Sequence, residues 1–398
     1  MSDTSSRPAV PHRPLDGYRV LDFTQNVAGP LAGQVLADLG AEVIKVEAPG
    51  GEAARRITST QPGLEHLAPY FLPLNRGKKS VAVDLRTDRG RAQVLALADT
   101  ADVILEAFRP GVMERLGLGA PAVQERNPRC VYASLSAFSG EGEQGRRPGI
   151  DMLAQAESGL LTGLRNAEGA PTVIRSTIVD AASGHVLAQA VLAALLGRER
   201  YGRADVIKVA LYDVACSLQA NSLTLQLNAD GVPDAGAPAD GRSPYATAPS
   251  GVYRAGDGQF IVVAAYVPKH WKLLTELLER PELAEDPRFA DQAVRSRYNA
   301  ELTAVLNAAF AQRGADEWVE MFRTAGLMAS RVHTWSETAR SEAFAEGRLA
   351  VTVTDGGRTE TVVRTPARYA GFSPAADRPT PRLGEHNDQL LRQTAATA

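Results

Sequence analysis

The chain has 398 residues and a mass of 42.4 kDa, which at roughly 100–200 residues per domain predicts two or three folded units. Its composition, 44% hydrophobic and 22% charged, is that of an ordinary globular protein. The 43 basic and 46 acidic residues leave a net charge of −3, which argues against a nucleic-acid-binding or membrane-surface protein.

The only cysteines, Cys130 and Cys216, are too few for a disulfide framework and favour a reducing cytoplasm. No uninterrupted run of 18 apolar residues occurs, so no membrane-spanning helix is expected. Residues 1–14 lack an apolar signal core and are expected to form a flexible tail. We therefore expect a cytoplasmic enzyme with neither nucleic-acid nor membrane partners.

The first half of the chain alternates apolar strand patterns with helical ones. Residues 17–23 and 41–47 are typical of buried strands, and between them apolar residues recur at helical spacing from Pro30 to Leu39, with Gly40 as the C-terminal cap. Further strands are expected at residues 80–85, 101–106, 130–135 and 205–211, and a further helix at 88–98. This order predicts an α/β fold with an open, doubly wound, Rossmann-like parallel sheet.

The remaining segments predict a second domain. Residues 172–174 have a strand-like pattern, and residues 228–249 are dense in glycine and proline, which is typical of a loop or domain crossing. Strands near 251–253 and 259–264 precede a mostly helical stretch. We expect a large α/β domain at 15–227, a smaller α+β domain at 228–325, and a return to the large domain at 326–398.

A dinucleotide-binding protein would begin in a similar way, with Gly29, Gly33 and Glu47 in suggestive places. The segment AGPLAG at 28–33 does not supply the required glycine spacing. Pro30 also lacks the N–H that a phosphate-binding turn donates. The sequence therefore favours a Rossmann-like fold that does not bind a dinucleotide.

A series of short motifs, ordered along nearly the whole chain, resembles the class III CoA-transferase family, which includes formyl-CoA transferase, carnitine CoA-transferase and α-methylacyl-CoA racemase. The motifs are LDG at 15–17, AGP at 28–30, LADLGAEVIKVE at 36–47, NRGKKS at 75–80, FRPG at 108–111, LG at 116–117, Gly149 with Asp151, and LGEH at 383–386. The resemblance implies an interlocked homodimer whose substrates are an acyl-CoA thioester and a free carboxylic acid. It implies coenzyme A as part of the substrate and no tightly bound cofactor.

The resemblance implies that Asp180, within TIVDAASG at 177–184, is a covalent nucleophile. On the residues alone, an apolar run that ends in a carboxylate before small residues is also typical of a helix N-cap. Both interpretations can hold, since a helix N-terminus would keep the carboxylate ionised. Attack on the thioester would give an aspartyl anhydride and CoA thiolate, so that acyl activation is preserved.

The phosphates of CoA predict a groove lined by cationic groups. Taken with the resemblance, the candidate CoA-binding residues are Arg115, Phe108, Ala28, Arg55, Arg56, Lys79, Ser136 and Phe138. Ser136 and Phe138 stand where formyl-CoA transferase has Lys and Tyr, which weakens the case for formate and oxalate as substrates. The six histidines show no metal-ligand spacing, so no metal is expected.

Two alternatives stay open. The racemase branch of the family needs a His where this chain has Ile150 and a Glu where it has Val267, so two bases for proton transfer are missing. A CoA-binding relative without catalytic activity would leave Asp180 dispensable. Within the transferase class, CoA could pass between two acids or within one dicarboxylic acid.

Overall fold

The computed structural model describes residues 13–140, 142–162, 164, 166, 168–232, 248–374 and 378–391. The expected tail at 1–14 and the loop at 228–249 lie largely outside these residues. The described chain divides into two compact units. The first takes the residues up to Leu161, those of Thr172–Ala220 and those from Ala345 onward, and the second takes Thr162–Pro171 and Asn221–Phe344.

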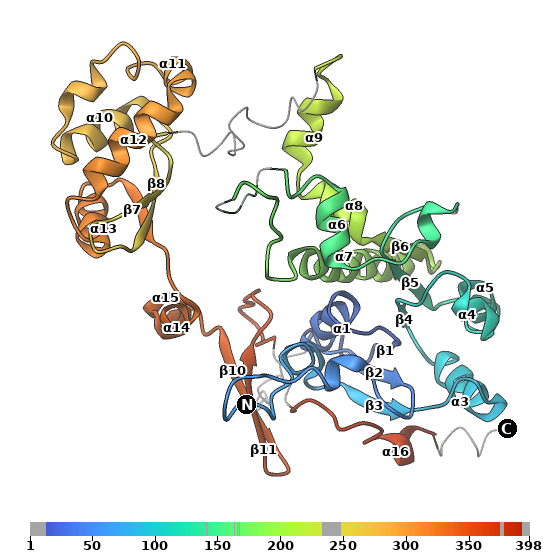
Figure 1. The fold of residues 1–398 in the computed structure, drawn as a ribbon. Coiled ribbons are helices and arrows are strands. Elements are labelled where there is room, and N and C mark those ends of the chain that lie inside the picture. The colour runs from blue at the N-terminus through green and yellow to red at the C-terminus, as the bar shows by residue number, and fades with distance from the viewer. Residues whose placement is uncertain are drawn as a thin grey trace, which may run out of the picture. The chain divides into compact units, whose positions relative to one another are not determined.

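The first unit is built on a six-stranded sheet in which every neighbouring pair is parallel. Its strands are β1 (Arg19–Asp22), β2 (Glu42–Glu47), β3 (Lys79–Ala82), β4 (Val103–Glu106), β5 (Val131–Ser136) and β6 (Val206–Ala210). The spatial order β3-β2-β1-β4-β5-β6 (Figure 1) places a topological switch point between β1 and β4. The expected Rossmann-like parallel sheet is therefore confirmed.

Helices cover both faces of this sheet because successive strand residues point to opposite sides. Val20 of β1 belongs to a core with α1 (Ala28–Asp38) and α7 (Ile178–Tyr201), whereas its neighbour Leu21 belongs to a core on the other face. That second face is covered by α3 (Asp88–Ala98), α5 (Ala120–Arg126) and α16 (Asn387–Leu391).

A close approach between α1 and α7 sets the position of the α7 N-terminus. A Cβ added at Gly184 of α7 would lie 2.6 Å from the carbonyl oxygen of Ala28 and 2.8 Å from Cβ of Leu31. Only glycine lets the two backbones come this close. The first turns of α7 therefore lie against the beginning of α1.

Shorter elements complete the first unit. They are η1 (Ala53–Arg55), α2 (Leu72–Asn75), α4 (Val112–Arg115), η2 (Gln144–Arg146), α6 (Asp151–Glu157), α8 (Leu211–Ser217), and the hairpin of β10 (Ala350–Asp355) and β11 (Arg358–Val363). The hairpin turns through Gly356 and Gly357, whose φ angles of 53° and 76° suit glycine. Helices α9 (Ala220–Leu227) and α15 (Glu342–Glu346) each include a position where the chain passes from one unit to the other.

The second unit has an antiparallel sheet in the order β7 (Gly251–Arg254), β8 (Phe260–Ala264), β9 (Met328–Arg331). Its helices are α10 (Pro268–Leu277), η3 (Pro281–Ala284), α11 (Gln292–Arg297), α12 (Asn299–Phe310), α13 (Ala315–Thr324) and α14 (Trp335–Arg340). Phe310 lies at the centre of its core, against Trp318 and Phe322. Because β9 pairs with β8, this unit extends past residue 325, where we expected the chain to return to the first domain.

Two local expectations differ from the structure. Residues 172–174 form no strand, because the amide N–H of Ile174 donates to the side chain of Gln155 at 2.9 Å instead of to a neighbouring strand. Among the described residues, α7 is long and apolar enough to cross a membrane by length and composition, although it contains no uninterrupted run of 18 apolar residues. One such helix is weak evidence of a span, since buried core helices pass the same test, and α7 packs Leu187 and Val191 into the core.

Candidate active site

Several predicted site residues follow the carboxyl ends of the parallel strands. Ala28 comes after β1, Phe108 after β4, and Phe138 after β5, of which Ser136 is the last residue. Ligands of open α/β sheets bind at this edge, beside the topological switch point. The sheet therefore gathers these positions along one edge of the first unit.

Asp180 lies in the first turn of α7, with its side chain half-buried. The N-cap residue is Thr177, whose side chain caps nothing, so the interpretation of Asp180 as the N-cap is wrong. The helix is capped by Asp151 instead, whose Oδ2 accepts from the backbone N–H groups of Val179 (2.8 Å) and Asp180 (3.0 Å). Asp151 thus holds the start of α7, the helix that carries Asp180.

Gln155 holds this capping carboxylate in place. It lies one turn further along α6, and its Nε2 donates to Oδ1 of Asp151 at 2.5 Å and to the carbonyl of Ile174 at 3.2 Å. Its Oε1 accepts from the N–H of Ile174. The segment leading into α7 is therefore tied to α6 by a fully paired amide.

The pKa of the Asp180 carboxyl is raised to about 7, chiefly by burial and further by the neighbouring charge of Asp151. Burial penalises the ionised form, and a like charge nearby penalises it again. We expected the helix N-terminus to keep Asp180 ionised, and the direction of the pKa shift contradicts that expectation. A carboxyl with a pKa near neutrality is typical of a functional site.

The loop between β1 and α1 is held by a buried ion pair. Lys45 Nζ lies 2.8 Å from Glu52 Oε1, and both side chains are buried. Lys45 also donates to the carbonyl of Thr24 (2.9 Å), and Glu52 Oε2 accepts from the N–H of Asn26 (2.8 Å). Asn26 takes a positive φ of 65°, a conformation that asparagine tolerates better than most residues. The pair therefore fixes the backbone that enters α1 at Ala28.

Phe108 and Arg115 follow β4 and lie at the switch point. Glu106, the last residue of β4, accepts from the N–H of Phe108 at 2.9 Å and so holds the loop close to the strand end. The Phe108 ring is half-buried against the core. Arg115 ends α4 and is exposed. The position of the two residues is compatible with a shared binding surface at this edge.

Ser136 and Phe138 make contacts within the unit. Ser136 Oγ donates to the carbonyl of Phe138 at 2.8 Å. The ring of Phe138 is buried, with the guanidinium of Arg147 4.4 Å from its centroid and the ring of Tyr212 at 6.0 Å. The guanidinium of Arg147 therefore covers one face of the Phe138 ring.

The remaining predicted cations are placed differently from one another. Arg55 forms a two-pronged pair with Glu47, at 2.7 and 2.6 Å, so its charge is matched inside the fold. Arg56 is exposed and donates to the carbonyl of Gly50. Lys79 is the first residue of β3 and pairs with Glu42, the first residue of β2. Lys79 thus belongs to the amino edge of the sheet, opposite the edge that gathers Ala28 and Phe108.

Sequence reasoning did not assign a role to Asp151 or to the Lys45–Glu52 pair. Asp151 was one of the matched motif residues, and a carboxylate at the start of a helix is a common signal of capping. The partner it caps lies 29 residues further along the chain, which no local pattern reveals. In the part of the chain that the structure describes, no cluster of His, Cys, Asp and Glu residues could hold a metal ion.

Comparison with known proteins decides the family. Residues 15–387 match the family described as CoA-transferase family III. The chain belongs to this family. Relatives include "Probable fatty acyl-CoA transferase Rv3272" of Mycobacterium tuberculosis, 58% identical with 96% of this chain and 98% of the relative covered. Acetyl-CoA:oxalate CoA-transferase of Acetobacter aceti is 32% identical, with 99% of each chain covered.

The fold agrees with solved structures of the family. A crystal structure of Rv3272 from Mycobacterium tuberculosis superposes with a TM-score of 0.86 at 56% identity, covering 96% of this chain and 99% of that one. The family and the names of the relatives indicate that this chain is a CoA-transferase enzyme, with CoA as part of its substrate. The expected family is therefore confirmed.

Proposed function

We propose that this CoA-transferase moves CoA between an acyl-CoA and a free carboxylic acid, with Asp180 as the covalent nucleophile. The observation that carries the proposal is the position of Asp180, half-buried in the first turn of α7 beside the beginning of α1. Among the described residues, no hydrogen bond or ion pair to its carboxylate is found. Such a carboxylate keeps its lone pairs available for attack.

The reaction balances with carboxylates and thioesters alone. A carboxylate oxygen of Asp180 attacks the thioester carbon, the C–S bond breaks, and CoA leaves as the thiolate. The thiolate then attacks the carboxyl carbon of Asp180 in the mixed anhydride, releasing the first acid and leaving an aspartyl-CoA thioester. An acceptor carboxylate repeats these two steps in reverse order, which forms the new acyl-CoA and restores Asp180.

The carboxyl edge of the sheet is the proposed position of CoA. Arg115 is exposed there and suits a phosphate, and Phe108 suits the adenine face. Ala28 begins α1 at this edge, Ser136 is the last residue of β5, and Phe138 follows it. Arg55 is proposed to contribute indirectly, through its ion pair with Glu47. The exposed Arg56 can approach a phosphate at the rim. Lys79 is withdrawn from this set because it lies at the other edge.

The acyl group is proposed to be a fatty acyl chain. The support is the name of the relative at 58% identity, whereas the oxalate-specific relative is only 32% identical. We further propose an interlocked homodimer in the cytoplasm. Large apolar side chains exposed on α6 and α7, among them Met152 and Leu196 at 50% and 57%, support a partner surface on the first unit.

The test replaces Asp180 by Asn and by Ala. Because both variants remove the nucleophile, we expect CoA exchange between a fatty acyl-CoA and a second acid to fall on the order of 10³-fold or more. Incubation with acyl-CoA followed by hydroxylamine or borohydride should modify Asp180 in the native enzyme, detected by peptide mass spectrometry.

The matched control is Asp88→Asn, which removes an aspartate from the first turn of the surface helix α3 and should leave exchange unchanged. Full exchange activity in Asp180→Ala would end the nucleophile assignment. Deuterium entering the α-carbon of the acyl group, without exchange, would favour a racemase instead. CoA binding with neither activity would favour a non-catalytic relative.

A further inference from the structure

The C-terminal segment covers the open edge of the parallel sheet. β3 is an edge strand, so the N–H and C=O groups on its outer side have no neighbouring strand to pair with. The N–H of Ser80 donates to Nδ1 of His386 at 3.2 Å, and its C=O accepts from the N–H of His386 at 2.9 Å. Asn387 pairs with Ala82 in the same way, since its side chain accepts from the N–H at 2.8 Å and donates to the C=O at 3.3 Å. Residues 381–387, the C-terminal clasp, therefore take the place of a further strand.

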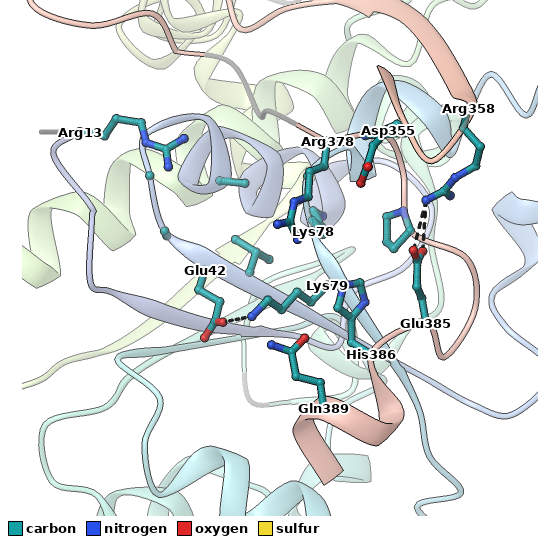
Figure 2. Close-up of a pocket in the computed structure, with 17 residues that line it drawn as sticks. Arg13, Glu42, Lys78, Lys79, Asp355, Arg358, Arg378, Glu385, His386 and Gln389 are labelled. Atoms are coloured by element: carbon teal, nitrogen blue, oxygen red, sulfur yellow. Dashed lines mark hydrogen bonds and ion pairs between the residues drawn. The ribbon is translucent and has the colours of Figure 1, made fainter. Parts of the chain in front are cut away.

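The β10–β11 hairpin also holds the clasp. Arg358, the first residue of β11, donates to the carbonyl of Thr380 at 2.9 Å and pairs with Glu385 at 3.2 Å (Figure 2). Glu385 also accepts from the N–H of Arg382 at 2.7 Å, which closes a turn within the clasp. The clasp is therefore tied to the hairpin as well as to the sheet edge.

The clasp supports the loop around η1, which follows β2. Arg55 Nη1 donates to the carbonyl of Pro381 at 2.9 Å. Gly51 has a positive φ of 68°, and a Cβ added there would lie 3.3 Å from Cδ2 of Leu383. The turn before η1 therefore lies against the clasp, and the guanidinium of Arg55 is hydrogen-bonded to it.

A second connection runs through the hydroxyl of Ser80. This hydroxyl accepts from the N–H of Gly384 in the clasp at 3.1 Å and donates to Oε2 of Glu47 at 3.1 Å. Glu47 is the last residue of β2 and holds the guanidinium of Arg55 with two hydrogen bonds. Both connections from the clasp therefore end at Arg55.

Arg56 comes directly after Arg55 and is exposed. Its guanidinium donates to the carbonyl of Gly50 at 2.9 Å, and no ion pair to it occurs within the part of the chain that the structure describes. The charge of Arg55 is matched by Glu47, whereas the charge of Arg56 is available to an anion.

We propose that the C-terminal clasp positions Arg56 for a phosphate of CoA, acting through Arg55. This inference rests on the proposed place of CoA at the carboxyl edge, and it adds to that site a segment whose Pro381 lies 326 positions after Arg55. A side chain that is already held in place loses less conformational freedom when it binds a ligand. The bonds from the clasp to Arg55 fix the backbone that carries Arg56, and so lower this cost. The residues of the clasp are positioning residues, since their contacts are with the protein.

The experiment compares two thioether ligands that differ in their phosphates. S-octyl-CoA has no thioester carbonyl to react, and S-octyl-pantetheine is the same compound without the nucleotide and its phosphates. Titration calorimetry with the full-length enzyme measures the dissociation constant of each. We expect Arg56→Gln to weaken the binding of S-octyl-CoA about tenfold, and Asn387→Ala to weaken it about threefold or more. Neither substitution should change the affinity for S-octyl-pantetheine.

The matched control is Gln389→Ala. It truncates an exposed side chain of α16, the helix that begins at Asn387, and this side chain has no hydrogen bond to any described residue. The control should bind both ligands like the native chain. Ser80→Ala removes only the hydroxyl between Gly384 and Glu47, and it should reproduce the effect of Asn387→Ala even where that variant folds poorly. Urea unfolding followed by circular dichroism reports the folding of each variant.

A double substitution tests the action through Arg56. If the clasp positions Arg56, adding Asn387→Ala to Arg56→Gln weakens the binding of S-octyl-CoA no further. Additive losses would show that the clasp acts independently of Arg56, and equal losses for the two ligands would show a general effect on the fold. Either result would overturn the inference.

Two further outcomes separate this inference from the proposed function. If Arg56→Gln kept the native affinity for S-octyl-CoA, the proposed place of Arg56 beside a CoA phosphate would be wrong, and the inference would fall with it. If Arg56→Gln lost affinity while Asn387→Ala did not, only the inference would fall.

Discussion

Besides burial, one neighbouring charge raises the pKa of Asp180, that of Asp151. Asp151 stabilises α7 by accepting two backbone N–H groups, and the same charge raises the pKa of Asp180. These effects oppose each other, because the capping bonds need an ionised Asp151 while the nucleophile needs an ionised Asp180. Above neutral pH, Asp180 is therefore a reactive and weakly stabilised carboxylate.

The pH dependence of exchange tests this coupling. With a pKa of about 7, Asp180 is ionised in roughly a tenth of molecules at pH 6, so kcat/KM should rise about tenfold between pH 6 and 8. In Asp151→Asn the neighbouring charge is gone and the pKa of Asp180 falls. The acid limb of the pH profile should therefore move to lower pH.

Glu157→Gln is the control for Asp151→Asn. It neutralises another carboxylate of α6, one that pairs with Arg147. That variant should keep the native limb. An unchanged limb in Asp151→Asn would mean that Asp151 does not influence the group that titrates.

At the scale of elements, the placement of Asp180 depends on how closely α7 approaches α1. Gly184→Ala puts a methyl group 2.6 Å from the carbonyl of Ala28, and the helices must separate. We expect a loss of about 1–3 kcal/mol in the free energy of unfolding, despite the better helix propensity of alanine. CoA exchange should fall as well, because the first turn of α7 moves with the helix.

The same helix offers a matched control for this substitution. Gly197 also lies in α7, and a Cβ there meets nothing within 4 Å. Gly197→Ala should be neutral or stabilising by up to about 1 kcal/mol. Urea unfolding followed by circular dichroism measures both variants. Equal stability of the two would show that the contact at Gly184 is not restrictive.

At the scale of the whole molecule, the chain has two units with separate cores, and all three tryptophans lie in the second unit. They are Trp271, Trp318 and Trp335. Tryptophan fluorescence therefore reports the unfolding of that unit, while circular dichroism reports both. Two-state behaviour is not expected of a chain built in this way.

This arrangement predicts separate responses to core substitutions. Phe310→Ala empties the aromatic core of the second unit and should destabilise it by about 3–5 kcal/mol, lowering the fluorescence midpoint in urea. Leu36→Ala creates a cavity in the core of the first unit. It should lower the urea midpoint of a transition seen by circular dichroism and leave the fluorescence midpoint unchanged. If Leu36→Ala lowered the fluorescence midpoint as much as Phe310→Ala, the units would unfold as one.

Much of the first unit could be predicted from the sequence, because its signals are local. Strand alternation, helical spacing and the cap at Gly40 all arise within about ten residues. The observed β1 and β2 lie inside the expected ranges, and α1 begins at Ala28, two residues before the expected start at Pro30. The second unit was harder to delimit. Residues 328–331 form a strand only through pairing with β8, more than 60 positions earlier. The expected strand at 172–174 does not form, because the N–H of Ile174 donates to the side chain of Gln155.

The family, the parallel sheet and the identity of a candidate carboxylate follow from the amino-acid sequence, since motifs and periodicity are properties of neighbouring residues. The pKa of that carboxylate and the sheet edge at which each cation lies follow from the folded structure. Asp151 meets Asp180, and Lys79 meets Glu42, because distant segments pack together. Electrostatic energies depend on distance and burial in space, and those quantities exist only once the chain has folded.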